Sequence, residues 1–448
     1  MTAHGGIRAL VLASAFALFP SPAAAQTVHD GSTVLVSRPS GDAPYTGRRD
    51  GTSDALAVSA DGRYVVFVSS IDEIADGVNL EEPAVLPRDR VAQTTVLVGR
   101  SDGAVGAAAS TPPSFGFSNP TAAVAVASAG SVPAEPLGVP HVLVAFSSNA
   151  GNLVDHATGA LIGTPDAVRI WLRDVTAATT TLVSRGDGRT GAPFTTGSTA
   201  PSIDNSPAGP LVAFARFGLA AIVRVVNAAR TVPVGCQQSG CGGSLIEGRA
   251  PDIRVGSGPS GPCTTSGPCV SIALTTSDPS YATGGPSQVV LFRTQIAGNT
   301  LTAPGAGEVV SRRDGATGAI ANAAALNAKL SSDATSVGFT STATNLTADP
   351  GTVLELPYVR NLATGRTILV AKSPTRPNRG LGHVSHFSIG GAAGALPRVL
   401  FPTAATNLAF LSSPGTRGPT CSTRPPARRR WSTARATGRR ARSTATGS

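Results

Sequence analysis

The chain has 448 residues, a net charge of +10 and only 4% aromatic residues. Nine of its arginines lie between Pro414 and Ser448, where no acidic residue occurs, and the rest of the chain has 27 basic and 26 acidic residues. Because the body of the chain is nearly neutral, it predicts no phosphate-binding stripe, and we expect no nucleic-acid partner if the arginine-rich end of the chain is read out of frame.

The N-terminal residues have the pattern of a secretory signal. Arg8 precedes the apolar run Ala9–Phe19, and the small residues Ser21–Ala25 follow. This pattern predicts a signal peptide over residues 1–25, cleaved after Ala25, and a secreted or periplasmic protein. The alternative is an uncleaved anchor, but the run is short for a membrane span. We expect no membrane span after cleavage.

The rest of the chain alternates short apolar runs with Gly, Asp, Asn and Pro, which is typical of an all-β protein. One apolar strand that ends in small or hydroxyl residues recurs six times: Tyr64–Ser70, Val142–Ser148, Leu211–Ala215, Val270–Thr276, Val337–Ser341 and Arg398–Thr403. This strand predicts the same element in six successive units.

A second strand runs into a glycine turn. Its copies are Val34–Gly41, Val96–Gly103, Thr181–Gly188, Glu308–Gly315 and Ile368–Thr375, with a degenerate copy at Thr231–Gly235. A third strand lies between these two signals, as in Arg169–Asp174 and Pro357–Asn361, and a fourth precedes the first signal, as in Ala55–Gly62. In the last of these, Asp61 and Gly62 supply a hairpin turn.

Four strands per unit, at intervals of about sixty residues, predict propeller blades. The expected fold is an all-β, six-bladed β-propeller of four-stranded antiparallel blades over residues 26–413, with valines and phenylalanines between adjacent blades. Residues 414–448 are expected to form a disordered tail. The last blade is expected to be incomplete, with Val34–Ser37 as an unpartnered outer strand that leaves an exposed edge.

The segment Val58–Ser69 reads VSADGRYVVFVS and resembles the TolB-type, WD-repeat-like propeller motif Ser-x-Asp-Gly-x-x-x-x-Phe-x-Ser, and Leu330–Phe339 is a weaker copy. The resemblance implies a TolB-like propeller over most of the mature chain. TolB itself has a further N-terminal α/β domain and a lipoprotein partner. Because the first predicted strand follows the cleavage site closely, we expect neither that domain nor that partner here.

Four cysteines form two close pairs, Cys236 with Cys241 and Cys263 with Cys269. In an exported protein, two local disulfides are the simplest arrangement, although crossed pairing stays open. A four-thiolate zinc site is the alternative, but these spacings are wider than those of zinc knuckles.

The arginine-rich tail differs from every repeat unit. Read in another frame, with inferred codons, residues 419–438 give a third strand, a Thr-Thr-Leu-Val-like strand and an Asp-Gly turn in the order of the other units. We therefore expect a frameshift between Leu408 and Gly415. The alternative is a true basic tail that binds nucleic acid or anionic envelope polymers.

Candidate site residues are few. His383 and His386 face opposite sides of a strand at their spacing, so we expect no metal site there. Asp-Gly pairs at 61–62, 102–103, 187–188 and 314–315 are expected to form turns rather than cation sites. Trp171 is expected to pack in the core. Arg38, Arg185 and Arg312 share one repeat position and are expected to flank turns in solvent, the alternative being recognition of an acidic partner.

No catalytic, cofactor-binding or metal-ligating residue is predicted, because the chain has no G-x-S-x-G, H-E-x-x-H or P-loop motif. The expected function is that of a monomeric binding or scaffold module, which recognises a protein or cell-envelope ligand through its inter-blade loops. The alternative is a propeller-fold hydrolase or lyase that acts at the central channel, and a truncated, inactive product is a third possibility. Acid and base groups with shifted pKa values around the channel would favour the enzyme.

Overall fold

The computed structural model describes residues 35–41, 53–71, 74–75, 84–110, 122–127, 140–162, 167–235, 247–256, 268–282, 285–348, 354–371, 387–390 and 398–400. The predicted signal peptide and the arginine-rich tail lie outside these ranges. The one helix of the described residues is α1 (Pro279–Ala282), so none of them forms a helix long enough to cross a membrane.

Five antiparallel sheets follow one another along the chain. The first contains β1 (Ser53–Val58), β2 (Tyr64–Ser69), β3 (Ala84–Asp89) and β4 (Thr94–Thr95). The second contains β5 (Ala122–Ala127), β6 (His141–Ser148), β9 (Arg169–Asp174) and β10 (Thr179–Leu182). A small hairpin of β7 (Val154–Asp155) and β8 (Ala160–Leu161) is inserted between β6 and β9.

The third sheet contains β11 (Ser198–Ser206), β12 (Gly209–Arg216), β13 (Ala221–Val225) and β14 (Arg230–Val234). The fourth contains β15 (Arg249–Gly256), β16 (Cys269–Thr276), β17 (Gln288–Ala297) and β18 (Thr300–Leu301), and β19 (Glu308–Val309) also pairs with β17. The fifth contains β20 (Ala325–Leu330), β21 (Ser336–Ser341), β22 (Leu356–Asn361) and β23 (Thr367–Leu369).

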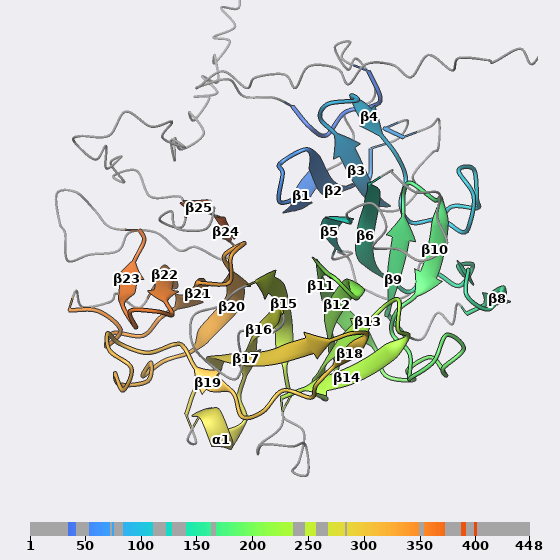
Figure 1. The fold of residues 1–448 in the computed structure, drawn as a ribbon. Coiled ribbons are helices and arrows are strands. Elements are labelled where there is room, and N and C mark those ends of the chain that lie inside the picture. The colour runs from blue at the N-terminus through green and yellow to red at the C-terminus, as the bar shows by residue number, and fades with distance from the viewer. Residues whose placement is uncertain are drawn as a thin grey trace, which may run out of the picture.

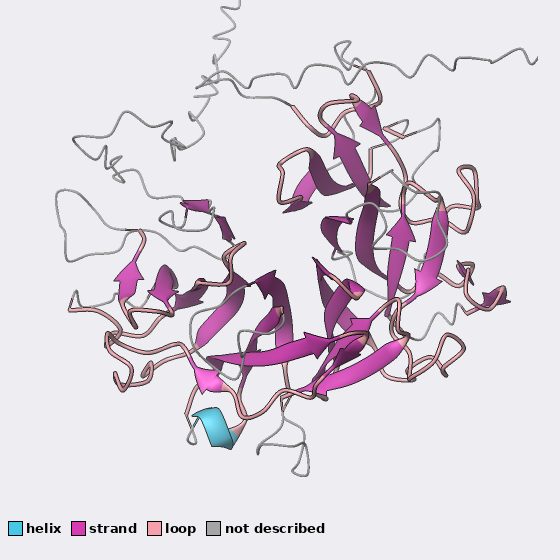
Figure 2. Ribbon diagram, in the orientation of Figure 1, coloured by secondary structure: helices cyan, strands magenta, loops and turns pink. Residues whose placement is uncertain are grey.

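The five sheets lie around a common centre, in chain order, as the blades of a β-propeller (Figure 1). Nearly all of the regular structure is strand (Figure 2). The all-β propeller is therefore confirmed with five blades. Among the described residues, the predicted sixth unit comprises β24 (Ser388–Gly390) and β25 (Arg398–Leu400), which form a two-stranded sheet beyond the fifth blade.

The hydrophobic core lies between neighbouring blades, as predicted. One cluster joins Leu211 and Val223 of the third blade to Ile272 and Phe292 of the fourth. Corresponding clusters join the first blade to the second, the second to the third and the fourth to the fifth. The recurrent phenylalanines of the second strands are at most 1% exposed: Phe67, Phe146, Phe214 and Phe339. Each side chain of this size contributes about 2–3 kcal/mol when buried, so the stacking of blades supplies the core.

Candidate functional site

The innermost strands of the third, fourth and fifth blades have the same local irregularity. A β-bulge interrupts β11, β15 and β20, and a residue with positive φ lies within it: Ala200 (51°), Ala250 (44°) and Asn327 (56°). Such a φ is uncommon for residues other than glycine. Bulges redirect side chains, and in each strand the second residue after the one with positive φ is polar: Ser202, Asp252 and Lys329.

Asp252 joins three blades. Its Oδ1 accepts a hydrogen bond from the Ser202 hydroxyl at 2.8 Å, and its Oδ2 accepts one from the Leu330 N–H at 2.7 Å. The Ser202 hydroxyl oxygen in turn accepts a hydrogen bond from the Ile253 N–H at 3.2 Å. The carboxylate of Asp252 therefore connects the innermost strands of the third, fourth and fifth blades.

The surroundings of Asp252 keep its carboxyl group ionised. Burial alone would raise the pKa of this carboxyl, but the positive charges of Arg254 and Lys329 and the hydrogen bonds from Leu330 and Ser202 lower the pKa below its usual value. The Arg254 guanidinium lies 3.5 Å from Asp252 Oδ1. Asp252 is thus a carboxylate at neutral pH.

Asp204, two residues after Ser202 on β11, has the opposite shift. Burial raises its pKa above the usual value, although Arg254 and backbone hydrogen bonds oppose the change. Its Oδ2 accepts a hydrogen bond from the Val255 N–H at 2.7 Å, and its Oδ1 accepts one from the Asn205 N–H at 2.9 Å. Asp204 therefore also connects the third blade to the fourth.

Two carboxyl groups whose pKa values are shifted in opposite directions can serve as an acid and a base. Here, however, each of the four carboxylate oxygens already accepts a hydrogen bond from the protein. Among the described residues, no group of three or more His, Cys, Asp or Glu side chains could hold a metal ion. The arrangement fits a structural connection between blades better than an open catalytic pair.

A second set of contacts joins consecutive blades at the Asp-Gly turns. In the second blade, Arg173 donates to the carbonyl oxygens of Ser101 and Gly103 at 3.0 and 2.8 Å, and the Thr180 hydroxyl donates to the Arg100 carbonyl oxygen at 2.6 Å. Asp102 Oδ1 accepts a hydrogen bond from the Thr180 N–H at 2.7 Å. We call this set of contacts, an arginine and a threonine of one blade on the preceding connector, the connector latch.

The connector latch recurs on the third and fifth blades. Arg224 and Thr231 hold residues 185–188, and Arg360 and Thr367 hold residues 312–315. The Asp-Gly pairs do form turns, since Gly62, Gly103, Gly188 and Gly315 have positive φ. The carboxylates at 102, 187 and 314 each accept a threonine N–H of the next blade.

The prediction that Arg185 flanks a turn in solvent is wrong. Arg185 is 1% exposed, and its Nη2 lies 2.8 Å from Oδ2 of the buried Asp155 on the inserted hairpin. The surroundings of this arginine leave no surface for an acidic partner. Arg312 donates to the carbonyl oxygens of Val309 and Ala316, and the Arg38 carbonyl oxygen accepts a hydrogen bond from the Thr95 hydroxyl of the first blade.

The structure describes some of the other residues for which the sequence predicted a role. Trp171 is fully buried, which confirms its packing role. Cys269 begins β16 and is disulfide-bonded. Cys236, Cys241, Cys263, His383 and His386 lie outside the described residues, so the disulfide pairing and the histidine interpretation stay predictions.

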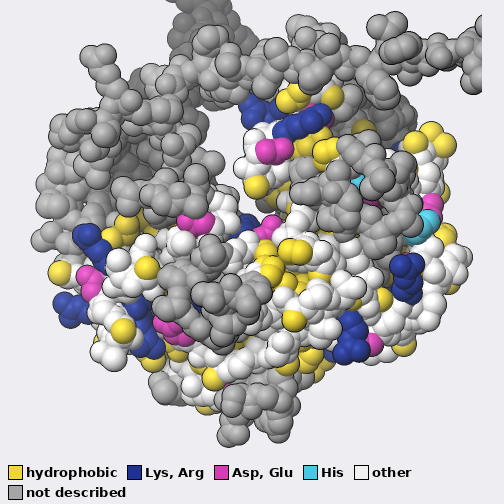
Figure 3. All heavy atoms as spheres, viewed as in Figure 1, with side chains coloured by type: hydrophobic (Ala, Val, Ile, Leu, Met, Phe, Trp, Pro, Cys, Tyr) yellow, Lys and Arg dark blue, Asp and Glu magenta, His cyan; other side chains and the backbone are white. Residues whose placement is uncertain are grey.

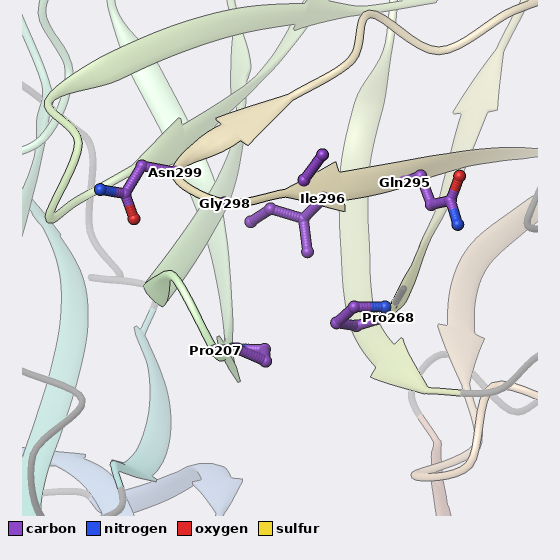
Figure 4. Close-up of a pocket in the computed structure, with 7 residues that line it drawn as sticks. Pro207, Pro268, Gln295, Ile296, Gly298 and Asn299 are labelled. Atoms are coloured by element: carbon purple, nitrogen blue, oxygen red, sulfur yellow. The ribbon is translucent and has the colours of Figure 1, made fainter. Parts of the chain in front are cut away.

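A shallow depression of about 480 Å³ lies between the third and fourth blades. Pro207, Pro268 and the β17–β18 turn line it (Figure 4), and none of its lining residues is ionisable. It offers no acid, base or nucleophile of its own.

One end of the propeller exposes large apolar side chains. Antiparallel pairing places the start of each innermost strand beside the end of the second strand, as for Ser198 with Arg216 and Ala325 with Ser341. At this end Phe217 is 46% exposed, Leu219 39%, Leu326 37% and Leu354 37%. We call these four residues the entry rim.

The space-filling view adds two observations. Hydrophobic side chains gather near the middle of the ring over β11 and β12, and Lys and Arg side chains are scattered over this face (Figure 3). The described part of this face has no basic stripe.

No protein-family model and no curated protein matches the chain. Solved structures do: TolB from Acinetobacter baumannii has 10% identity and a TM-score of 0.34, over 70% of this chain and 53% of that one. Putative TolB from Agrobacterium tumefaciens has 11% identity and a TM-score of 0.35, over 71% of this chain and 80% of that one. The GH43 endo-arabinanase from Bacillus licheniformis has 8% identity and a TM-score of 0.28, over 69% of this chain and 95% of that one.

Two TolB structures are thus among those that the chain resembles, as its repeat motif predicts. The match spans about half of the Acinetobacter TolB chain. Because these TM-scores are below 0.5, the similarities do not indicate a ligand or an activity for this chain. The fold assignment rests on the sheet topology.

Proposed function

We propose that this protein is an exported, monomeric β-propeller that binds a protein or cell-envelope ligand at its entry rim. The observation that carries the proposal is the exposure of Phe217 and Leu219 on the turn between β12 and β13. A buried interface gains most from aromatic and large aliphatic side chains. The proposed ligand therefore has an apolar surface.

The hydrogen bonds that the buried polar groups make within the protein support the same function. Asp204 and Asp252 hold neighbouring blades together, and the connector latch uses the Asp-Gly carboxylates. The carboxylates of Asp204 and Asp252 on the innermost strands thus have structural partners, whereas the entry rim exposes apolar side chains.

The proposal includes a sixth blade that begins with β24 and β25. Contacts between successive innermost strands run from β5 to β11, β15 and β20, and β20 then contacts β24. This continuation supports β24 as the innermost strand of a further blade. Export would follow from the signal peptide predicted over residues 1–25.

Site-specific photocrosslinking tests the proposal. The photoreactive residue p-benzoylphenylalanine is placed at position 219, and at Leu161 as a control, because Leu161 is 65% exposed on the inserted hairpin. We expect a discrete crosslinked partner from an envelope extract at position 219 and none at 161. With the photoreactive residue kept at position 219, the additional change Phe217→Ser should reduce the yield of the crosslinked partner. Equal crosslinking at both positions would overturn the proposal.

The opposite pKa shifts of Asp204 and Asp252 favour one second candidate, a hydrolase or lyase that acts at the central channel. In that case Asp204 would be the acid and Asp252 the base. A panel of glycoside and ester substrates tests it: turnover that Asp204→Ala abolishes, at unchanged circular dichroism, would favour the enzyme over the binding module.

A further inference from the structure

Arg216 is the last residue of β12 and lies beside the apolar side chains of the entry rim. It pairs with Ser198 of β11, and Phe217 follows it directly in the chain. The Leu219 N–H donates to the Arg216 carbonyl oxygen at 3.1 Å, so the chain turns at this point. Arg216, Phe217 and Leu219 therefore share one turn at the entry end of the third blade.

Two residues of the preceding connector hold the guanidinium group of Arg216. Its Cζ lies 4.0 Å from the centre of the Phe194 ring, within the range of a cation–π contact. Its Nε and Nη2 donate to the Thr196 hydroxyl oxygen at 3.3 and 3.0 Å. The Phe194 ring in turn packs against Phe214, with the ring centres 6.3 Å apart. The guanidinium group is thus positioned before any ligand binds.

The two bonds to Thr196 use one edge of the guanidinium group. Arginine has five N–H donors in a fixed planar fork, so the two donors of Nη1 and one of Nη2 are left. Among the described residues, none accepts a hydrogen bond from these three donors, and none supplies a carboxylate that pairs with Arg216. The Nη1–Nη2 edge is one that a carboxylate can bind with two parallel hydrogen bonds.

The electrostatic surroundings of Arg216 favour an added negative charge. Burial lowers the pKa of Arg216, whereas the hydrogen bond to Asp89 raises the pKa of Arg63 in the first blade. Arg216 is still a cation at neutral pH, but burial has removed part of its hydration. A carboxylate that reaches it would form charge-assisted hydrogen bonds, which are stronger than those between neutral groups.

The number of cations indicates the class of the partner. Two other arginines at this end of the propeller already have protein partners. Arg249 lies 2.8 Å from Glu247, and the buried Arg169 donates to the Phe194 carbonyl oxygen at 2.8 Å. Anionic polymers and lipid surfaces are bound by clusters of cations. One guanidinium group beside exposed apolar side chains instead fits one carboxylate within an apolar protein segment.

We propose that the entry rim recognises a protein segment in which an aspartate or glutamate stands next to a large apolar residue. The carboxylate binds the Nη1–Nη2 edge of Arg216, and the apolar side chain packs against Phe217 and Leu219. This inference rests on the binding function proposed for the entry rim and adds the charge of the partner.

Peptide selection from a random dodecapeptide phage library on the full chain tests the proposal. We expect the selected peptides to be enriched, relative to the unselected library, in Asp or Glu next to a large apolar residue. The same selection on Arg216→Gln should show no such enrichment. Arg230→Gln is the control, because Arg230 is 58% exposed and lies at the opposite end of the same blade. Absence of the enrichment on the wild type, or its persistence on Arg216→Gln, would overturn the proposal.

Fluorescence polarisation with one labelled, selected peptide measures the contact itself. Replacement of the peptide's acidic residue by its amide should weaken binding to the wild type about tenfold, as expected for the loss of a charge-assisted hydrogen-bonded pair. It should not weaken binding to Arg216→Gln. Because the change is in the peptide, the first result does not depend on how the protein variant folds. Equal affinity of the acidic and amide peptides for the wild type would overturn the proposal.

Phe217→Ser distinguishes failure of the carboxylate contact from failure of the entry rim. Peptides that need Phe217 but neither Arg216 nor an acidic residue would overturn the carboxylate contact and leave the rim as a binding site. Peptides that bind Phe217→Ser as tightly as the wild type would count against both. Vesicles of phosphatidylglycerol and phosphatidylcholine are the last probe. Binding of these vesicles that Arg216→Gln abolishes, without selection of acidic peptides, would assign Arg216 to a lipid headgroup and overturn the proposal.

Discussion

Asp252 on β15 accepts a hydrogen bond from the hydroxyl of Ser202 on β11 at 2.8 Å, so a buried carboxylate joins the innermost strands of two blades. Replacement of Asp252 by alanine leaves that hydroxyl and the Leu330 N–H without their acceptor. A buried polar group without a partner costs about 1–3 kcal/mol. We expect Asp252→Ala to lower the free energy of unfolding by about 2–4 kcal/mol, measured by urea denaturation.

The same residue predicts a pH dependence. The pKa of Asp252 is lower in the folded protein than in the unfolded chain, whose aspartates titrate near 3.9. Its contribution to stability is therefore complete above the unfolded value and is lost as the pH falls through the folded one. The stability difference between the wild type and Asp252→Ala should be constant from pH 7 to 5 and shrink below about pH 4. A difference that grows on acidification would contradict this assignment.

The connector latch depends on the forked shape of arginine. Arg224 donates to the carbonyl oxygens of Gly186 and Gly188 and to the Thr231 hydroxyl. Burial and the nearby Arg185 lower its pKa to about 10, so it is charged at neutral pH. A lysine cannot reach all three acceptors, and we expect Arg224→Lys to cost about 2 kcal/mol.

The control for this change is Arg230→Lys. Arg230 is 58% exposed and lies 3.6 Å from Asp187, and exposed ion pairs contribute at most about 1 kcal/mol. Thermal denaturation of both variants measures the two losses of stability. Similar losses at positions 224 and 230 would show that the latch adds no specific stability.

A tight approach at Gly191 gives a fourth prediction. A β-carbon there would overlap the carbonyl oxygens of Gly186 and Asp187 in the connector turn, whereas one at Gly151 would meet nothing within 4 Å. Gly191→Ala should therefore lower Tm by several degrees, as expected for about 1–3 kcal/mol of strain. Gly151→Ala should leave Tm nearly unchanged, and a tolerated Gly191→Ala would contradict the turn geometry.

The strands of this fold could be predicted because each has its own local pattern. Tyr64–Ser70, for example, is observed as β2 (Tyr64–Ser69). The connector latch could not be predicted, because its partners are far apart in sequence, as for Thr180 and Arg100. For the same reason the buried position of Arg185, which depends on Asp155, was not expected.

The residues of the candidate site have a weak sequence signal that spans two repeat units. Ala200–Asp204 reads APSID and Ala250–Arg254 reads APDIR, at the same place in successive units. This repeat marks the bulged strands. The pKa shifts of Asp204 and Asp252 arise from contacts between blades, which no single segment specifies.

The carboxylates of Asp204 and Asp252 join blades, and we propose that recognition belongs to the exposed rim. A double-mutant cycle of Ser202→Ala and Asp252→Ala, measured by urea denaturation, tests whether the Asp252 carboxylate joins two blades. We expect a coupling free energy of about 1 kcal/mol or more between the two changes. Additive losses would contradict it, because they would mean that the Asp252 carboxylate does not depend on Ser202 and is available for other chemistry.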